Sequence, residues 1–142
     1  MSAAAAATPE DLAAFHASLA RASADARFLD LFYDGFMAAS PAIAAIFAGR
    51  DMAALKRKLG SSLHVMTLAI DRAPGADMYL EYLAKVHGRF HIPREMYDLW
   101  LEALVAAAAQ CDPAFDERLQ RVWQRVVGAG ILLIKPPPAL AA

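Results

Sequence analysis

The chain has 142 residues, and its 14 Lys and Arg against 15 Asp and Glu give a formal net charge of −1. A domain of this length buries roughly two-thirds of the surface that its unfolded chain exposes, which allows a core without covalent staples. Binding to nucleic acid or to anionic lipid depends on neutralising many phosphates, so this charge balance argues against both kinds of partner.

The cysteine count and the N-terminal segment indicate which cellular compartment to expect for this protein. Cys111 is the single cysteine, so no internal disulfide can form and no Cys/His zinc spacing exists. The start, MSAAAAATPE, lacks the charged and Leu-rich parts of a secretory signal. No run of about 20 apolar residues could span a membrane. We therefore expect one soluble, cytoplasmic domain over 1–142, with flexible tails at 1–7 and 136–142.

Apolar residues recur at helical spacing between turn signals, and no strand pattern is present. Thr8-Pro9 is a typical helix start, with Thr8 as the cap and proline in the first turn. Pro41 ends the second helix, because the residue before a proline disfavours helix. The pattern predicts an all-α domain with six long helices over about 9–21, 23–39, 51–71, 77–90, 93–110 and 114–134, and a short turn at 41–47.

Two polar residues fall on apolar helix faces. His87 lies on one line with Leu80 and Leu83, and Tyr33 lies on one line with Leu29. An unpaired buried polar group costs about 1–3 kcal/mol, so both side chains need partners. A metal between them would satisfy both, because neutral imidazole is a good ligand for haem iron and the phenol could donate to a gas on the opposite side.

Two segments resemble bacterial globins, and in particular the haem domain of flavohaemoglobins. The sequence Phe-Tyr-Asp-Gly-Phe at 32–36, with Pro41 and Ile46-Phe47 after it, resembles the second helix and its corner in that family. The segment 87–97 resembles the proximal helix and the start of the next one, and Trp123 falls at a frequent family tryptophan. The resemblance spans about 12–134 and implies a globin fold of six to eight helices around a haem pocket.

The resemblance assigns roles on both sides of the haem. It makes His87 the ligand of the iron of haem b, and Phe47 the aromatic wedge on the haem face. Tyr33 matches the distal tyrosine of flavohaemoglobins. Leu55 falls where the family often has a distal glutamine or histidine, and Leu59 lies one turn further along.

Further contacts with the cofactor are implied for residues on and after the proximal helix. They are Leu83, Ile92 and Trp100 as pocket lining, Arg89 and His91 as partners of the propionates, and Tyr97 near the proximal imidazole.

Two alternatives for the iron site remain open in the sequence. His91 is the rival ligand, one turn after His87, although Ile92-Pro93 places it at the end of its helix. On the distal side, a shift of one or two residues from Leu55 would bring a member of the run 56–58 (Lys-Arg-Lys) closer to the iron. Without such a shift, that run is a solvated face and Tyr33 is the main hydrogen-bond donor.

The chain departs from flavohaemoglobins where these pair the proximal tyrosine with a glutamate late in the last helix. Residues 135–138 are Lys-Pro-Pro-Pro, with no acidic side chain. This argues against a peroxidase-like donation of electron density from the proximal imidazole to the iron. Outside the pocket, we expect His16 and His64 to be structural or exposed, and Cys111 to be inert beside Asp112.

The resemblance implies a protein that binds O₂, NO or CO reversibly at its haem. The leading hypothesis is oxygen binding or transport, extended to oxidation of nitric oxide if an external flavin reductase supplies electrons. The alternatives are a haem-based gas or redox sensor that acts through a separate partner, and a globin-like interaction domain without haem. We expect a monomer or a weak homodimer that binds neither nucleic acid nor membranes.

Overall fold

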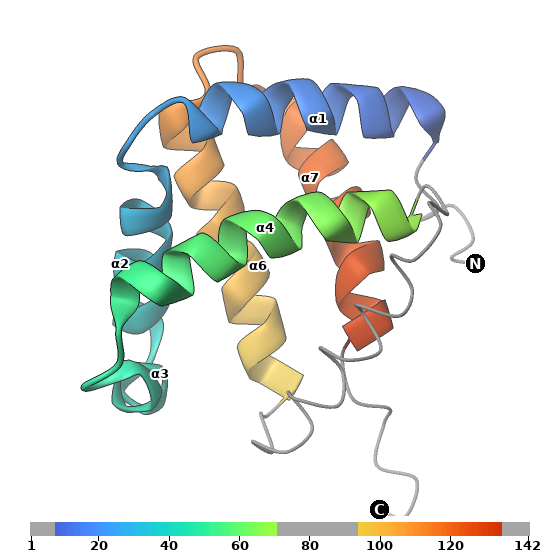
Figure 1. Cartoon of the computed structure of the whole chain (residues 1–142). Helices are drawn as coiled ribbons and strands as arrows, with labels where there is room; N and C mark the ends of the chain where they lie inside the picture. Colours follow the sequence, from blue (N-terminus) through green and yellow to red (C-terminus); the bar gives the residue numbers. More distant parts are fainter. Residues whose placement is uncertain (1–7, 71–93, 135–142) are drawn as a thin grey trace, which may run out of the picture.

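The computed structural model describes residues 8–70 and 94–134, and this part of the chain consists of α-helices joined by short turns (Figure 1). The helices are α1 (Pro9–Ser23), α2 (Phe28–Ala39), α3 (Pro41–Phe47), α4 (Met52–Ile70), α6 (Arg94–Cys111) and α7 (Glu117–Ile134). The all-α prediction is thus confirmed. The helix expected over 77–90 lies outside the described residues.

The start of α1 follows directly from its sequence. The Asp11 amide donates to the Thr8 hydroxyl oxygen at 3.0 Å, and the Thr8 amide donates to the Asp11 carboxylate at 3.0 Å. This reciprocal capping box satisfies two amides that the first turn of a helix leaves without partners. Arg125 of α7 donates to the same Asp11 carboxylate at 2.8 Å, so the cap also ties the two helices together.

Two predicted helix starts and one predicted turn differ from the structure, and a local polar contact accompanies each difference. Helix α2 begins at Phe28 rather than at residue 23, since the Asp25 carboxylate accepts the Arg27 amide at 2.9 Å and forms a separate turn. Helix α7 begins at Glu117 rather than at 114, because Asp116 caps the Leu119 amide at 2.8 Å. Residues 41–47 form a full α-helix, with Ser40 as its cap.

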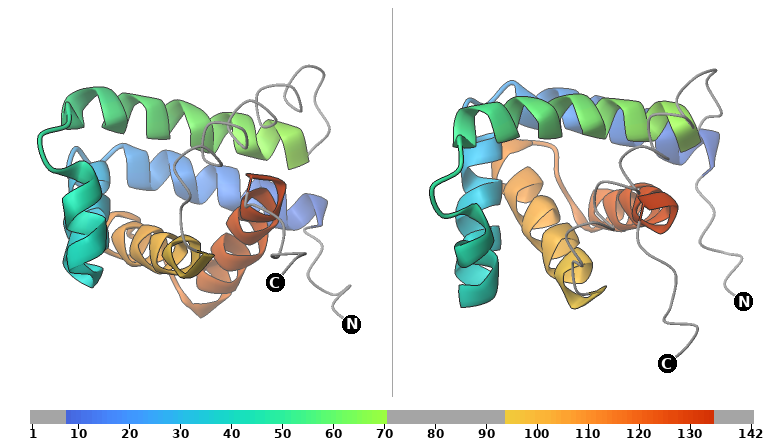
Figure 2. Two further views of the ribbon diagram at one scale, coloured as in Figure 1. Left: turned by 90° about the horizontal axis from the view of Figure 1, so that it is seen from below. Right: turned by 60° about the horizontal axis from the view of Figure 1, so that its bottom comes forward.

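Two antiparallel helices, α1 and α4, run along one side of the molecule (Figures 1 and 2). Helix α2 stands at one end of this pair and packs on α3 and α6, while α7 packs on α1, α4 and α6. The turn between α3 and α4 uses Gly49 at φ 76°, a left-handed conformation that glycine adopts without strain. This turn brings Phe47 and the first turns of α4 to the same end of α2.

The core is built from large side chains of all six described helices. Its fully buried members include Phe15, Phe32, Ile43, Leu63, Leu104 and Trp123. None of the described helices is both long enough and apolar enough to cross a membrane.

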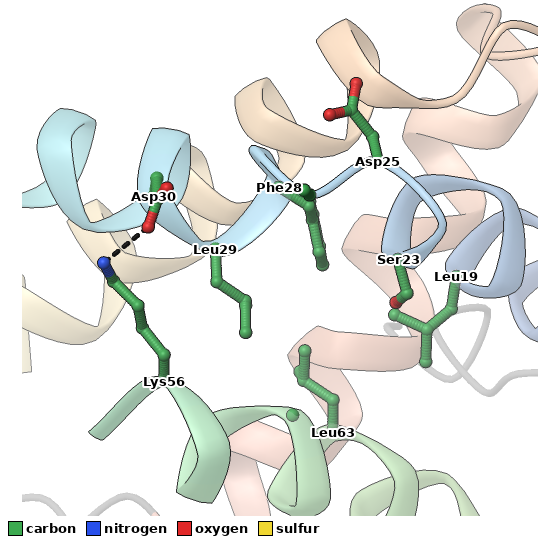
Figure 3. A pocket seen from close by; sticks show the side chains of 10 residues that line it. Leu19, Ser23, Asp25, Phe28, Leu29, Asp30, Lys56 and Leu63 are labelled. Atoms are coloured by element: carbon green, nitrogen blue, oxygen red, sulfur yellow. Dashed lines mark ion pairs between the residues drawn. The ribbon is translucent and has the colours of Figure 1, made fainter. Parts of the chain in front are cut away.

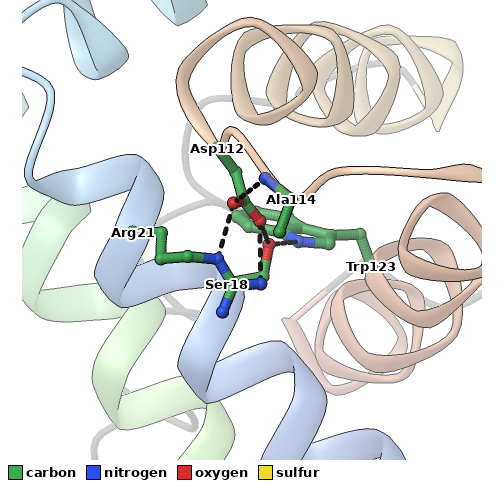
Figure 4. Close-up of polar contacts among 5 residues, drawn as sticks. All are labelled: Ser18, Arg21, Asp112, Ala114 and Trp123. Carbon is green, nitrogen blue, oxygen red and sulfur yellow. Dashed lines mark hydrogen bonds and ion pairs between the residues drawn. The ribbon is translucent and has the colours of Figure 1, made fainter.

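A buried polar cluster joins α1 to the corner between α6 and α7 (Figure 4). The Ser18 hydroxyl donates to Asp112 Oδ2 at 2.6 Å and accepts from the Trp123 indole N–H at 2.9 Å. Arg21 donates to Asp112 Oδ1 at 2.6 Å, and the Ala114 amide donates to the same oxygen at 2.9 Å. Three segments of the chain thus meet on one buried carboxylate.

Candidate functional site

Tyr33 lies in the second turn of α2, and its side chain is almost fully buried. Its hydroxyl donates to the backbone carbonyl oxygen of Leu55, in the first turn of α4, at 3.4 Å. Burial raises the pKa of the phenol to about 12. The hydroxyl therefore keeps its proton at neutral pH and is available as a hydrogen-bond donor.

Phe47, the last residue of α3, packs its ring edge-on against Tyr33, with centroids 5.5 Å apart and planes at 77°. The same ring lies 5.9 Å from Phe36, one turn after Tyr33 on α2. The helix period places Tyr33 and Phe36 on one face of α2, and the turn after Pro41 folds Phe47 back onto that face. The phenol therefore has an aromatic wall on one side and the backbone of α4 on the other.

Helix α6 adds a further aromatic side chain to this group. Trp100 packs edge-on against Phe32, with ring centroids 5.8 Å apart, and Phe32 in turn packs on Tyr33 at 4.8 Å. Tyr97 lies one turn before Trp100 and is 6% exposed. Burial raises the pKa of its phenol as well.

The apolar side chains around Tyr33 are only partly covered. Phe47, Leu55, Leu59 and Trp100 pack against the core, yet each retains an exposed part. Four such side chains, from α3, α4 and α6, offer apolar contacts to a flat, largely apolar group.

The structure does not place the residues expected on the proximal side. His87, Leu83, Arg89, His91 and Ile92 all lie outside the described residues. Across 8–70 and 94–134 there is no group of three or more His, Cys, Asp or Glu side chains that could hold a metal ion.

Two features of the site were not predicted. One is that the backbone carbonyl of Leu55 accepts a hydrogen bond from Tyr33. Only the side chain of Leu55 was expected to contribute to the site. The other concerns Lys56, which is not purely solvated: its ammonium forms an ion pair with Asp30 of α2 at 2.5 Å. Arg57 and Lys58 are exposed, as expected of a solvated face.

The remaining polar residues lie as the sequence suggests. His16 and His64 are exposed, and Cys111 is buried at the end of α6. Burial raises the pKa of the Cys111 thiol, which lowers its reactivity.

The family model described as Globin matches residues 30–131, which is most of the chain. The chain belongs to the globin family. As a globin it binds haem and diatomic gases, and the helices described above are those of the globin fold.

A solved structure agrees with this assignment. The chain is similar to a protein from Pseudomonas aeruginosa PAO1, described as structurally highly homologous to a human haemoglobin, with 35% identity and a TM-score of 0.82. The match covers 88% of this globin and 95% of the other chain. Comparison with curated proteins gives no significant match. The finer resemblance to flavohaemoglobins remains an expectation from the sequence.

Proposed function

We propose that this globin binds O₂ reversibly at haem b and that Tyr33 donates the hydrogen bond that retains the gas. The observation that carries the proposal is the buried, protonated Tyr33 hydroxyl between Phe47 and the backbone of α4. Bound O₂ carries partial negative charge, so a hydroxyl donor beside it lowers its free energy. A hydrogen bond to a charged acceptor contributes about 1.5–3 kcal/mol, or about ten- to a hundredfold in affinity.

The described residues fit a haem. Phe47, Leu55, Leu59 and Trp100 supply partly exposed apolar surface on three helices, which suits the faces and edges of a porphyrin. We assign His87 as the residue that holds the iron, on the resemblance described above. The same resemblance assigns Leu83, Ile92, Tyr97 and His91 as further contacts of the haem. When bound, haem supplies an iron with one coordination position open to a diatomic gas.

The hydrogen bond from Tyr33 to Leu55 is compatible with a donor role. Its length of 3.4 Å exceeds the 2.5–3.0 Å typical of O–H···O bonds, so the hydroxyl exchanges this acceptor for a better one at little cost. The carbonyl nevertheless orients the phenol while no gas is present. The Tyr33 phenol is thereby kept in one orientation before it donates a hydrogen bond to the gas.

Removal of the hydroxyl tests the proposal. The O₂ dissociation rate of the ferrous protein should rise about ten- to a hundredfold in Tyr33→Phe, because the ring is retained and only the donor is lost. Asp34→Asn is the control, since Asp34 follows Tyr33 on α2 with an exposed side chain, and it should leave the rate unchanged. An unchanged rate in Tyr33→Phe would exclude the phenol as the donor.

The same donor supports the oxidation of nitric oxide, NO + O₂ + e⁻ → NO₃⁻. Retention of O₂ beside Tyr33 favours this reaction over simple loss of the gas. We assign the electron to an external flavin reductase. Stopped-flow consumption of NO by the O₂-loaded protein should form nitrate in equal amount, and formation of nitrite instead would argue against the reaction.

A further inference from the structure

Two contacts between α2 and α4 lie side by side in the structure. The Tyr33 hydroxyl reaches the Leu55 carbonyl at 3.4 Å. The Lys56 ammonium reaches Asp30 at 2.5 Å (Figure 3). Asp30 and Tyr33 are one helical turn apart on α2, and Leu55 and Lys56 are adjacent on α4. The ion pair and the tyrosine contact therefore join the same two helical turns.

Beyond this point, side chains of α2 and α4 border a common cavity. A cavity of about 240 Å³ lies beside the ion pair, and Lys56 and Asp30 are part of its lining (Figure 3). Its apolar lining comes from Leu19, Phe28, Leu29 and Leu63. Side chains that border a cavity lack packing partners on that side, so they constrain the distance between the helices less than a filled interface would.

Gly60, one turn beyond Lys56, does not fix that distance. A Cβ built on Gly60 would lie 4.0 Å from Leu29 Cδ1, which is ordinary van der Waals contact with no close fit. The ion pair is a direct contact of opposite charges between the two helices, and it lies one residue from the Leu55 carbonyl along α4.

We propose that Asp30 and Lys56 form a positioning pair that sets the spacing of α2 and α4 and so orients the Tyr33 hydroxyl toward the bound gas. This inference rests on the proposed function of Tyr33. The two charged side chains pair with each other. They act through the backbone of α4, whose Leu55 carbonyl is the alternative acceptor for the phenol. Hydrogen bonds weaken steeply as distance and angle depart from their best values. A small change in the spacing of α2 and α4 therefore changes the strength of the hydrogen bond that Tyr33 donates.

The size of the effect follows from the exposure of the pair. Lys56 and Asp30 are 31% and 57% exposed, and such partly solvated pairs contribute modest free energies. Loss of the pair should therefore accelerate O₂ dissociation from the ferrous globin about two- to fivefold. Lys56→Met and Asp30→Asn should each do so. The reversed pair, Asp30→Lys with Lys56→Asp, should return the rate to near the original value.

Lys58→Met is the matched control, because Lys58 is an exposed lysine on the same helix. It should leave the dissociation rate unchanged. Equal effects of Lys56→Met and Lys58→Met would show that the pair has no specific role and would overturn the proposal. Failure of the reversed pair to restore the rate would do the same.

A double-mutant cycle separates this inference from the proposed function. In a Tyr33→Phe background, Lys56→Met should cause no further acceleration, since its effect passes through the hydroxyl. The same acceleration with and without the hydroxyl would refute positioning but leave Tyr33 as the donor. If Tyr33→Phe alone changes nothing, the proposed function fails, and the inference drawn from it fails too.

A measurement without gas examines the orientation directly. In the haem-loaded protein labelled with ¹³Cζ-tyrosine, the Tyr33 resonance can be assigned by its absence in Tyr33→Phe. It should shift in Lys56→Met, return in the reversed pair and stay in place in Lys58→Met. An unmoved resonance in Lys56→Met would contradict a positioning role whatever the dissociation rates show.

Discussion

The Ser18 hydroxyl and the Asp112 carboxylate meet at 2.6 Å although 94 residues separate them in the sequence. The contact joins the middle of α1 to the end of α6, and the Trp123 indole extends it to α7 through Ser18. Asp112 is held in addition by Arg21 and the Ala114 amide. This cluster fixes the end of α6 opposite to the one that carries Tyr97 and Trp100.

Loss of the Asp112 carboxylate should destabilise the fold markedly. Asp112→Ala leaves the buried Ser18 hydroxyl without its acceptor and frees the Ala114 amide, so the free energy of unfolding should fall by about 3 kcal/mol. Asp34→Ala is the control, because Asp34 is exposed on α2 and should matter little. Urea unfolding followed by circular dichroism measures both variants. Similar losses in the two would show that the cluster adds nothing to stability.

The same carboxylate predicts a pH dependence. Burial alone would raise the pKa of Asp112, but Arg21, Ser18 and the Ala114 amide hold it below its ordinary value of 3.8. The folded state therefore binds the ionised form better than the unfolded state does. The resulting stability is complete above the ordinary pKa and is lost as pH falls through the folded one. The gap between the original protein and Asp112→Asn should shrink on acidification, whereas a gap independent of pH would contradict this.

The Tyr33 phenol predicts a loss of stability as pH rises, opposite in direction to the effect of Asp112. Burial raises the pKa of its phenol from 10.0 to about 12, so the folded state favours the neutral form. The stability that this contributes is complete below pH 10 and is lost as pH rises toward 12. Measured against Tyr33→Phe, the original protein should lose stability across this window. Parallel stability curves for the two proteins would mean that Tyr33 titrates as an ordinary tyrosine.

Helix content and fold class followed from the sequence because apolar spacing, prolines and caps such as Thr8 act locally. Helix starts were harder to predict. Asp25 and Asp116 each satisfy amides of a turn, and the sequence alone does not show which of several acids takes that role. The ion pair of Lys56 with Asp30 depends on how α2 crosses α4, and no local pattern encodes that crossing.

The site, too, was predictable from the sequence only in part. The resemblance to globins singled out Tyr33, Phe47 and Leu55, and the structure brings these three residues together. Leu55 was expected to contribute an apolar side chain alone. Its backbone carbonyl in addition accepts a hydrogen bond from the Tyr33 phenol. Every residue carries such a carbonyl, so composition gives no signal for it. The assignment of His87 rests on the sequence and the family.

We propose that His87 holds the haem iron and that Tyr33 faces the bound gas from the other side. Optical spectra of the haem-loaded protein in its ferric, ferrous and CO states, with His87→Ala compared against His91→Ala, test this assignment. His91→Ala should keep the spectra of the original protein, while His87→Ala should lose the bands of imidazole-ligated haem and regain them with added imidazole. Unchanged spectra in His87→Ala, with loss in His91→Ala, would contradict it.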